Sequence, residues 1–104
     1  FLRHLSRTKI LLHLVDSAPY DEKIDPVEDI KKIISELKKY DEALFKKPRW
    51  LILNKIDLVD DIDHIKDRII KELEWDAPIF EISAINGEGC NNLSRKIMEY
   101  IDSI

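Results

Sequence analysis

Three short apolar runs alternate with three amphipathic helical patterns, and this alternation restricts the fold more than any other feature of the chain. The runs are Ile10–Val15, Trp50–Leu53 and Ile79–Ile82, and all three are of strand length. The first two are nearly continuously apolar, which is typical of parallel strands covered on both faces. Strands that alternate with helices form βαβ crossovers. The sequence therefore predicts an α/β fold, with a three-layer parallel sheet and helices on both faces.

The helix with the strongest signals begins at Pro26, a residue that suits the first helical position. Asp25 can cap this helix, and Glu28 completes a capping-box arrangement. A second helix is expected after Asp61 and a third from about Asn91 to the end. Apolar residues at helical spacing should face the sheet. They are Val27, Ile30, Ile33, Ile34 and Leu37 in the first helix, Ile62, Ile65, Ile69 and Leu73 in the second, and Leu93, Ile97 and Ile101 in the third.

Composition fits one small domain with a modest core. Apolar residues make up 44% and charged residues 37% of the 104 positions, which excludes disordered and collagen-like classes. The net charge of −4 predicts no direct DNA partner. No apolar run approaches the roughly 18 residues of a membrane span, and Cys90 is the single cysteine, so we expect a cytoplasmic protein without a membrane partner. Phe1–Arg7 is interpreted as the tail of a preceding helix, and the chain as a fragment.

The sharpest functional signal is the tetrapeptide Asn54-Lys55-Ile56-Asp57, directly after the second strand, where parallel sheets bind ligands. A fixed carboxylate such as Asp57 can accept hydrogen bonds from both N1–H and the exocyclic amine of guanine, a donor pair that adenine lacks. Asn54 can donate towards the acceptor side of the base and brace neighbouring loops. The aliphatic stem of Lys55 can cover the base face while its ammonium stays in water. The alternative is that Asn54 and Asp57 form only a turn and a helix cap.

A second signal follows the third strand. The small residue Ala84 lets its backbone N–H approach the base O6, and Ser83 can brace the loop that carries Asp57. Gly87 and Gly89, the only glycines in the chain, permit a tight turn into the last helix. The predicted guanine-binding residues are Asn54, Lys55, Asp57, Ser83, Ala84 and Ile85, with no catalytic residue and no metal ligand among them.

Phosphate binding in such domains requires a loop of the form Gly-x-x-x-x-Gly-Lys-Ser/Thr. With glycines only at positions 87 and 89, the chain contains no such loop. It also lacks an Asp-x-x-Gly segment that could hold magnesium and the γ-phosphate. The chain alone is therefore not expected to hydrolyse GTP.

The pairing of Asn54–Asp57 with Ser83–Ala84 resembles the fourth and fifth sequence motifs of translation-factor-type small GTPases. Nearly the whole chain is similar to the Obg (CgtA) family in particular. The flanking stretches that carry this closer resemblance are Phe1-Leu2-Arg3-His4-Leu5, Leu11-Leu12-His13-Leu14-Val15-Asp16, Asp25-Pro26-Val27, Ile34-Ser35-Glu36-Leu37 and Lys47-Pro48-Arg49-Trp50.

This resemblance implies that residues 1–104 are the C-terminal half of an Obg-type G domain with a P-loop NTPase-type fold. The parent protein is then a GTP hydrolase that binds GTP, GDP and Mg²⁺ and associates with the large ribosomal subunit during ribosome biogenesis. Its phosphate-binding half, its magnesium ligands and its N-terminal Obg domain lie outside these residues. Ile85 departs from the pattern, because many GTPases have a lysine there that packs on the base. We therefore expect weaker base affinity and faster exchange.

Two other functions remain possible from the sequence. One is a non-catalytic α/β protein-interaction module that uses the helix Pro26–Tyr40 as a docking surface. The other is a flavodoxin-like or Rossmann enzyme, which is disfavoured because no Gly-x-Gly-x-x-Gly follows any strand. The strand Ile10–Val15 is central in the Obg-type sheet, so alone it would present an unpaired apolar edge. We expect the chain to self-associate, or to bind a partner fragment, through this strand.

Overall fold

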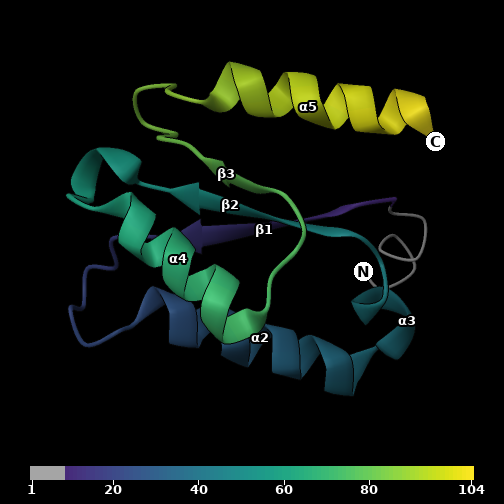
Figure 1. Cartoon of the computed structure of the whole chain (residues 1–104), viewed down its shortest axis with the longest axis horizontal. Helices are drawn as coiled ribbons and strands as arrows, with labels where there is room; N and C mark the ends of the chain where they lie inside the picture. The colour runs from purple at the N-terminus through teal and green to yellow at the C-terminus, as the bar shows by residue number, and fades with distance from the viewer. Residues whose placement is uncertain (1–8) are drawn as a thin grey trace.

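The computed structural model describes residues 9–104, so the predicted helix at Phe1–Arg7 lies outside the described residues. A parallel sheet contains β1 (Leu11–Asp16), β2 (Arg49–Asn54) and β3 (Ile79–Glu81), with β2 in the middle. Because the strands run in the same direction, their carboxyl ends lie at one edge of the molecule, on the left in Figure 1. The predicted α/β class with a parallel sheet is confirmed.

The helices lie on both sides of this sheet. The longer ones are α2 (Pro26–Tyr40), α4 (Ile62–Leu73) and α5 (Cys90–Ser103), and two short ones are α3 (Glu42–Phe45) and the 3₁₀ helix η1 (Ile56–Leu58). Figure 1 shows α2 and α4 on one side of the strands and α5 on the other. Within residues 9–104, no helix combines the length and the apolar character needed to cross a membrane.

The middle strand β2 organises two hydrophobic clusters, one on each face of the sheet. Its alternate residues Leu51 and Leu53 are fully buried towards α2 and α4, while Trp50 and Ile52 are buried towards α5. The ring of Trp50 lies 5.1 Å from that of Phe80 and 5.4 Å from that of Tyr100, between centroids. The first cluster consists of Val15, Val27, Ile30, Leu51, Leu53 and Ile69, and the second of Ile10, Trp50, Ile52 and Ile82.

Coverage of β1 on both faces is the expectation that was wrong. Leu12 and Leu14 are 43% and 66% exposed, although they lie on the same face as buried Ile10. The reason is the position of α5, which packs over β2 and β3 and leaves the far end of β1 uncovered. Among residues 9–104, β2 is the only strand that pairs with β1, so β1 is an edge strand of this sheet, as expected.

The helix starts follow the predicted capping residues. Asp25 accepts a hydrogen bond from the Val27 amide at 2.9 Å, and Asp61 accepts one from the His64 amide at 3.1 Å. Glu28, expected to complete a capping box, instead accepts from Lys31 Nζ at 2.9 Å. Two residues predicted to face the sheet are substantially exposed: Ile33 at 41%, beside the uncovered edge of β1, and Ile101 at 40%, in the last turns of α5.

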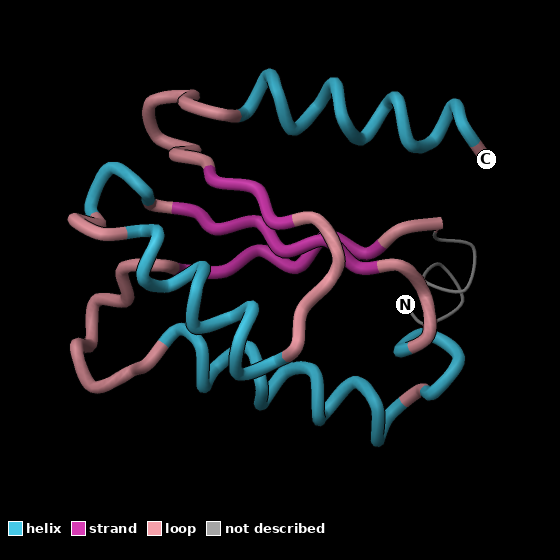
Figure 2. Tube along the Cα trace, viewed as in Figure 1, coloured by secondary structure: helices cyan, strands magenta, loops and turns pink. Residues whose placement is uncertain are grey.

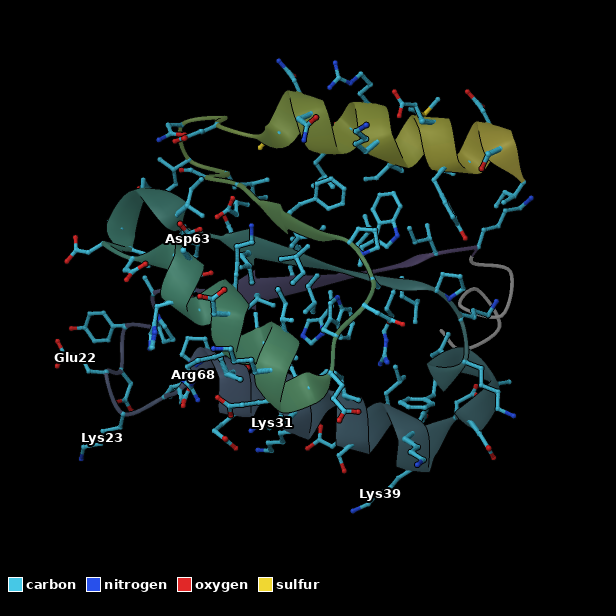
Figure 3. The ribbon with its side chains drawn as sticks, viewed as in Figure 1. Glu22, Lys23, Lys31, Lys39, Asp63 and Arg68 are labelled. Atoms are coloured by element: carbon cyan, nitrogen blue, oxygen red, sulfur yellow. The ribbon has the colours of Figure 1, made fainter. Side chains whose placement is uncertain are left out.

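A charged network joins α2 to α4. The Arg68 guanidinium donates to both carboxylate oxygens of Asp25 at 3.0 and 2.9 Å, and its Nε donates to Glu72 at 2.8 Å. Lys31 also donates to Glu72, at 2.6 Å. Figure 3 shows Arg68 and Lys31 where α4 passes over α2, whereas Lys39 extends away from the far end of α2. The network thus links the first turns of α2 to the second half of α4.

Candidate functional site

Three loops leave the carboxyl ends of the strands, and Figure 2 shows them at the same end of the sheet. The first begins at Asp16, the second contains Asn54 and Lys55 before η1, and the third runs from Ser83 to Gly89. Asp16 and Asn54 are partners in the parallel register of β1 and β2, so their side chains leave neighbouring strands at the same level. The strand register thus brings all six predicted site residues to one edge of the sheet.

Asn54 connects the second loop to the third. Its Oδ1 accepts hydrogen bonds from the Lys55 amide at 2.8 Å and from the Ala84 amide at 3.0 Å. Lys55 adopts the left-handed conformation, with φ +64°, which turns the chain sharply from β2 into η1. A single amide oxygen therefore fixes this sharp turn and ties it to the end of the neighbouring strand.

Asp57 is held by the third loop as well. The Ser83 hydroxyl donates to Asp57 Oδ1 at 2.8 Å, and the Ile56 amide donates to the Ile82 carbonyl at 3.2 Å. Ser83 is fully buried, whereas Asp57 is exposed. An ionised carboxylate accepts several hydrogen bonds, so one bond from Ser83 leaves capacity for a ligand. Ser83 thus braces the loop that carries Asp57, as expected from the sequence, while the Asp57 carboxylate is exposed.

The third loop is closed by its own backbone. The Ser83 amide donates to the Glu88 carbonyl at 2.9 Å, and the Gly87 amide donates to the Ser83 carbonyl at 2.8 Å. Gly89 has φ +77°, and a Cβ there would lie 2.3 Å from the Glu81 carbonyl oxygen. Only glycine fits this position, because any side chain would overlap with the backbone of β3. The tight turn into α5 predicted from the two glycines is confirmed.

The Ala84 N–H, predicted to approach a base oxygen, already donates to Asn54. A ligand oxygen at this point would share the donor with Asn54 or displace it. Ile85 is 85% exposed and extends the same loop towards solvent.

Asp16 contacts the predicted site residue Lys55 but was not among the residues predicted from the sequence. Its Oδ2 accepts a hydrogen bond from Lys55 Nζ at 2.8 Å, which joins the first and second loops. The sequence offers one signal for Asp16, which is the polar residue that ends the first strand. In the structure it is the register partner of Asn54. A sequence pattern alone does not reveal this contact, because 39 positions separate the two residues.

Within residues 9–104 no group of three or more His, Cys, Asp or Glu side chains is placed to hold a metal ion. A groove of about 420 Å³ lies elsewhere, between the exposed edge of β1 and α2, and is mostly apolar. Its lining includes Leu12, Leu14, Ile33 and Leu37.

No protein-family model matches the chain.

Proposed function

We propose that this chain is the guanine-recognising half of a GTP-binding domain. The observation that carries the proposal is the pair of bonds between the second and third loops. Ser83 orients the Asp57 carboxylate at 2.8 Å, and Asn54 braces Ala84 at 3.0 Å, on the same edge of a parallel sheet. A turn or helix cap made only by the tetrapeptide would not require these bonds to a second strand end.

Recognition follows from the hydrogen-bonding capacity of these groups. Asp57 accepts from N1–H and the exocyclic amine of guanine, and a base without that donor pair leaves the carboxylate unpaired. The NH₂ group of Asn54 serves the acceptor side of the base, and the N–H of Ala84 serves it as a donor shared with Asn54 Oδ1. The stem of Lys55 covers one face of the base. Ile85 contributes only contact at the rim, which favours weaker binding and faster exchange.

The exposed edge of β1 supports the wider proposal of a longer parent protein. In it, the first half of a P-loop G domain would pair with β1 and supply the phosphate loop and the magnesium ligands, so GTP hydrolysis would belong to the parent. Leu12 and Leu14 are side chains that such a partner would cover. Similarity to the Obg family makes the large ribosomal subunit the proposed partner and the cytoplasm the proposed compartment.

The direct test is a titration of the full-length parent with a fluorescent guanine nucleotide, in competition with unlabelled guanine and adenine nucleotides. Displacement by GDP and GTP, but not by ADP and ATP, is expected. Equal displacement by adenine nucleotides would overturn the proposal.

The residue-level test is Asp57→Asn in the full-length parent. The new amide can donate to the carbonyl that xanthine carries in place of the guanine amine. Preference should move from GTP to xanthosine triphosphate, with each mismatch costing about 1–3 kcal/mol. Asp60→Asn is the matched control, because Asp60 is also exposed and lies three positions further along the same segment. It should leave the preference for GTP unchanged. An unchanged preference in Asp57→Asn would exclude this carboxylate as the reader of the base.

A protein-interaction module is the second candidate, and the apolar groove between β1 and α2 favours it. The two functions are separated by the same titration, because an interaction module has no reason to discriminate guanine from adenine.

A further inference from the structure

The two carboxylate oxygens of Asp16 have different partners. Oδ1 accepts from the Ala18 amide at 3.0 Å, within its own loop, and Oδ2 accepts from Lys55 Nζ at 2.8 Å, from the neighbouring loop. The first bond fixes the orientation of the carboxylate, because a side chain bonded to the amide two residues on forms a closed local turn. The carboxylate that accepts from Lys55 Nζ is therefore already oriented by its bond to the Ala18 amide.

Lys55 is consequently held at both ends. Its backbone amide donates to Asn54 in a left-handed turn, and its ammonium is bound by Asp16. The lysine side chain is 35% exposed and that of Asp16 47%, so the pair is partly open to solvent. An unrestrained lysine side chain samples many rotamers and loses this freedom when it packs on a ligand. A lysine already tethered at its tip loses less, which favours binding through pre-organisation.

We propose that Asp16 is a positioning residue for nucleotide binding, which holds the Lys55 ammonium so that the lysine stem lies ready to cover the base. This inference rests on the proposed guanine-binding function. Asp16 acts through Lys55 and does not itself touch the base.

The variant that separates the two bonds of Asp16 is Asp16→Ser. A serine hydroxyl can still accept from the Ala18 amide, but it is too short to reach Lys55. In the full-length protein, the affinity for fluorescent GDP should fall about three- to fivefold, as expected for loss of one partly exposed ion pair. The loss should shrink as salt is raised, because exposed charges are screened. The preference for guanine over xanthine should not change, since Asp57 is intact.

A double-mutant cycle with Lys55→Met tests whether Asp16 acts through the lysine. In that background Asp16→Ser should cause no further loss of affinity. Glu28→Gln is the matched control: it removes an ion pair of 2.9 Å, to Lys31, that lies within α2 and outside the three strand-end loops, and it should leave GDP affinity unchanged. Circular dichroism and melting temperature show whether Asp16→Ser folds; if it does not, Asp16→Asn enters the same cycle.

The outcomes separate this inference from the proposed function. Wild-type protein that shows no guanine preference overturns the proposed function. Wild-type protein that binds GDP, with Asp16→Ser equal to it, overturns the inference alone. An equal loss with and without Lys55 also overturns it, because Asp16 would then act by another route.

Discussion

At the scale of single residues, the site depends on backbone positions that ordinary side chains rarely occupy. Lys55, Gly87 and Gly89 all have positive φ, and all three lie in the loops that follow β2 and β3. The left-handed conformation is unfavourable for residues with a Cβ, so Lys55 persists there because Asn54 fixes its amide. The shape of these loops thus depends on the left-handed backbone at these three positions as well as on hydrogen bonds.

The two glycines provide a matched pair of substitutions. Gly89→Ala places a Cβ 2.3 Å from the Glu81 carbonyl oxygen, whereas a Cβ at Gly87 meets nothing within 4 Å. Gly87→Ala should destabilise the fold by about 1 kcal/mol, from its positive φ alone. Gly89→Ala should cost clearly more, about 3 kcal/mol, because backbone must move as well. Urea unfolding of both variants measures the difference, and equal losses would contradict the overlap.

At the scale of elements, the contact between α2 and α4 is polar at its rim and apolar beneath. Arg68 spans the two helices through its paired bonds to Asp25, which is also the cap of α2. The hydrogen bond from Arg68 is the main cause that lowers the pKa of Asp25 below its usual 3.8. One arginine therefore stabilises both the helix start and the packing of the next helix.

Arg68→Met should destabilise the domain by about 1 kcal/mol, a value discounted because the paired side chains are about one-third exposed. Lys96→Met is the control, because the Lys96–Glu99 pair on α5 is longer, at 3.5 Å, and more exposed. It should cost no more than a few tenths of a kcal/mol. Thermal unfolding measures the loss of stability in the two variants. An equal loss would show that Arg68 contributes no more to stability than an ordinary surface ion pair.

Acid should remove the contribution of Asp25. Its folded-state pKa lies below that of the unfolded chain, so the unfolded chain takes up protons first as the pH falls. The stabilisation is present above pH 3.8 and is lost as the pH falls through the lower folded value. Asp25→Asn should therefore lose less stability than the wild type between about pH 4 and 2. Arg68→Met should show a similarly flattened profile in urea unfolding across this range, and a wild-type profile in both variants would refute the linkage.

At the scale of the whole molecule, α5 covers only part of one face of the sheet. Within residues 9–104, β1 and β3 are the two edge strands, and α5 packs over β2 and β3 and leaves Leu12 and Leu14 of β1 exposed. An unpaired apolar edge is a template for pairing with another chain. In the parent protein proposed above, this edge would pair with the first half of a G domain.

The chain of 104 residues should accordingly self-associate through β1 as its concentration rises. Leu14→Lys places a charge on the open edge, at a residue 66% exposed, and should weaken association roughly tenfold with little effect on stability. Met98→Lys, at a residue 58% exposed on α5, is the control and should leave association unchanged. Analytical ultracentrifugation measures both, and a monomer across the whole concentration range would contradict the prediction.

The sequence by itself determined the strands and the long helices, and it predicted that the candidate-site residues lie at one edge of the sheet. The strands and the long helices follow from hydrophobic periodicity, and the starts of α2 and α4 from Asp25 and Asp61, because these signals are local. The neighbourhood of Asp57 and Ser83 was also predictable, since parallel strands bring their carboxyl ends to one edge. The four-residue helix α3 was missed because it is too short to show a period, although Asp41 caps it at 3.0 Å.

Only the tertiary structure decided which neighbours each element has. The apolar run Ile10–Val15 predicted that Leu12 and Leu14 are buried, yet the placement of α5 over β2 and β3 leaves them exposed. The bond from Lys55 to Asp16 depends on the register between β1 and β2, and the bond from Ala84 to Asn54 on the approach of two loops. Periodicity encodes which face of an element is apolar, whereas coverage and side-chain pairing depend on residues distant in the chain, whose positions no local pattern contains.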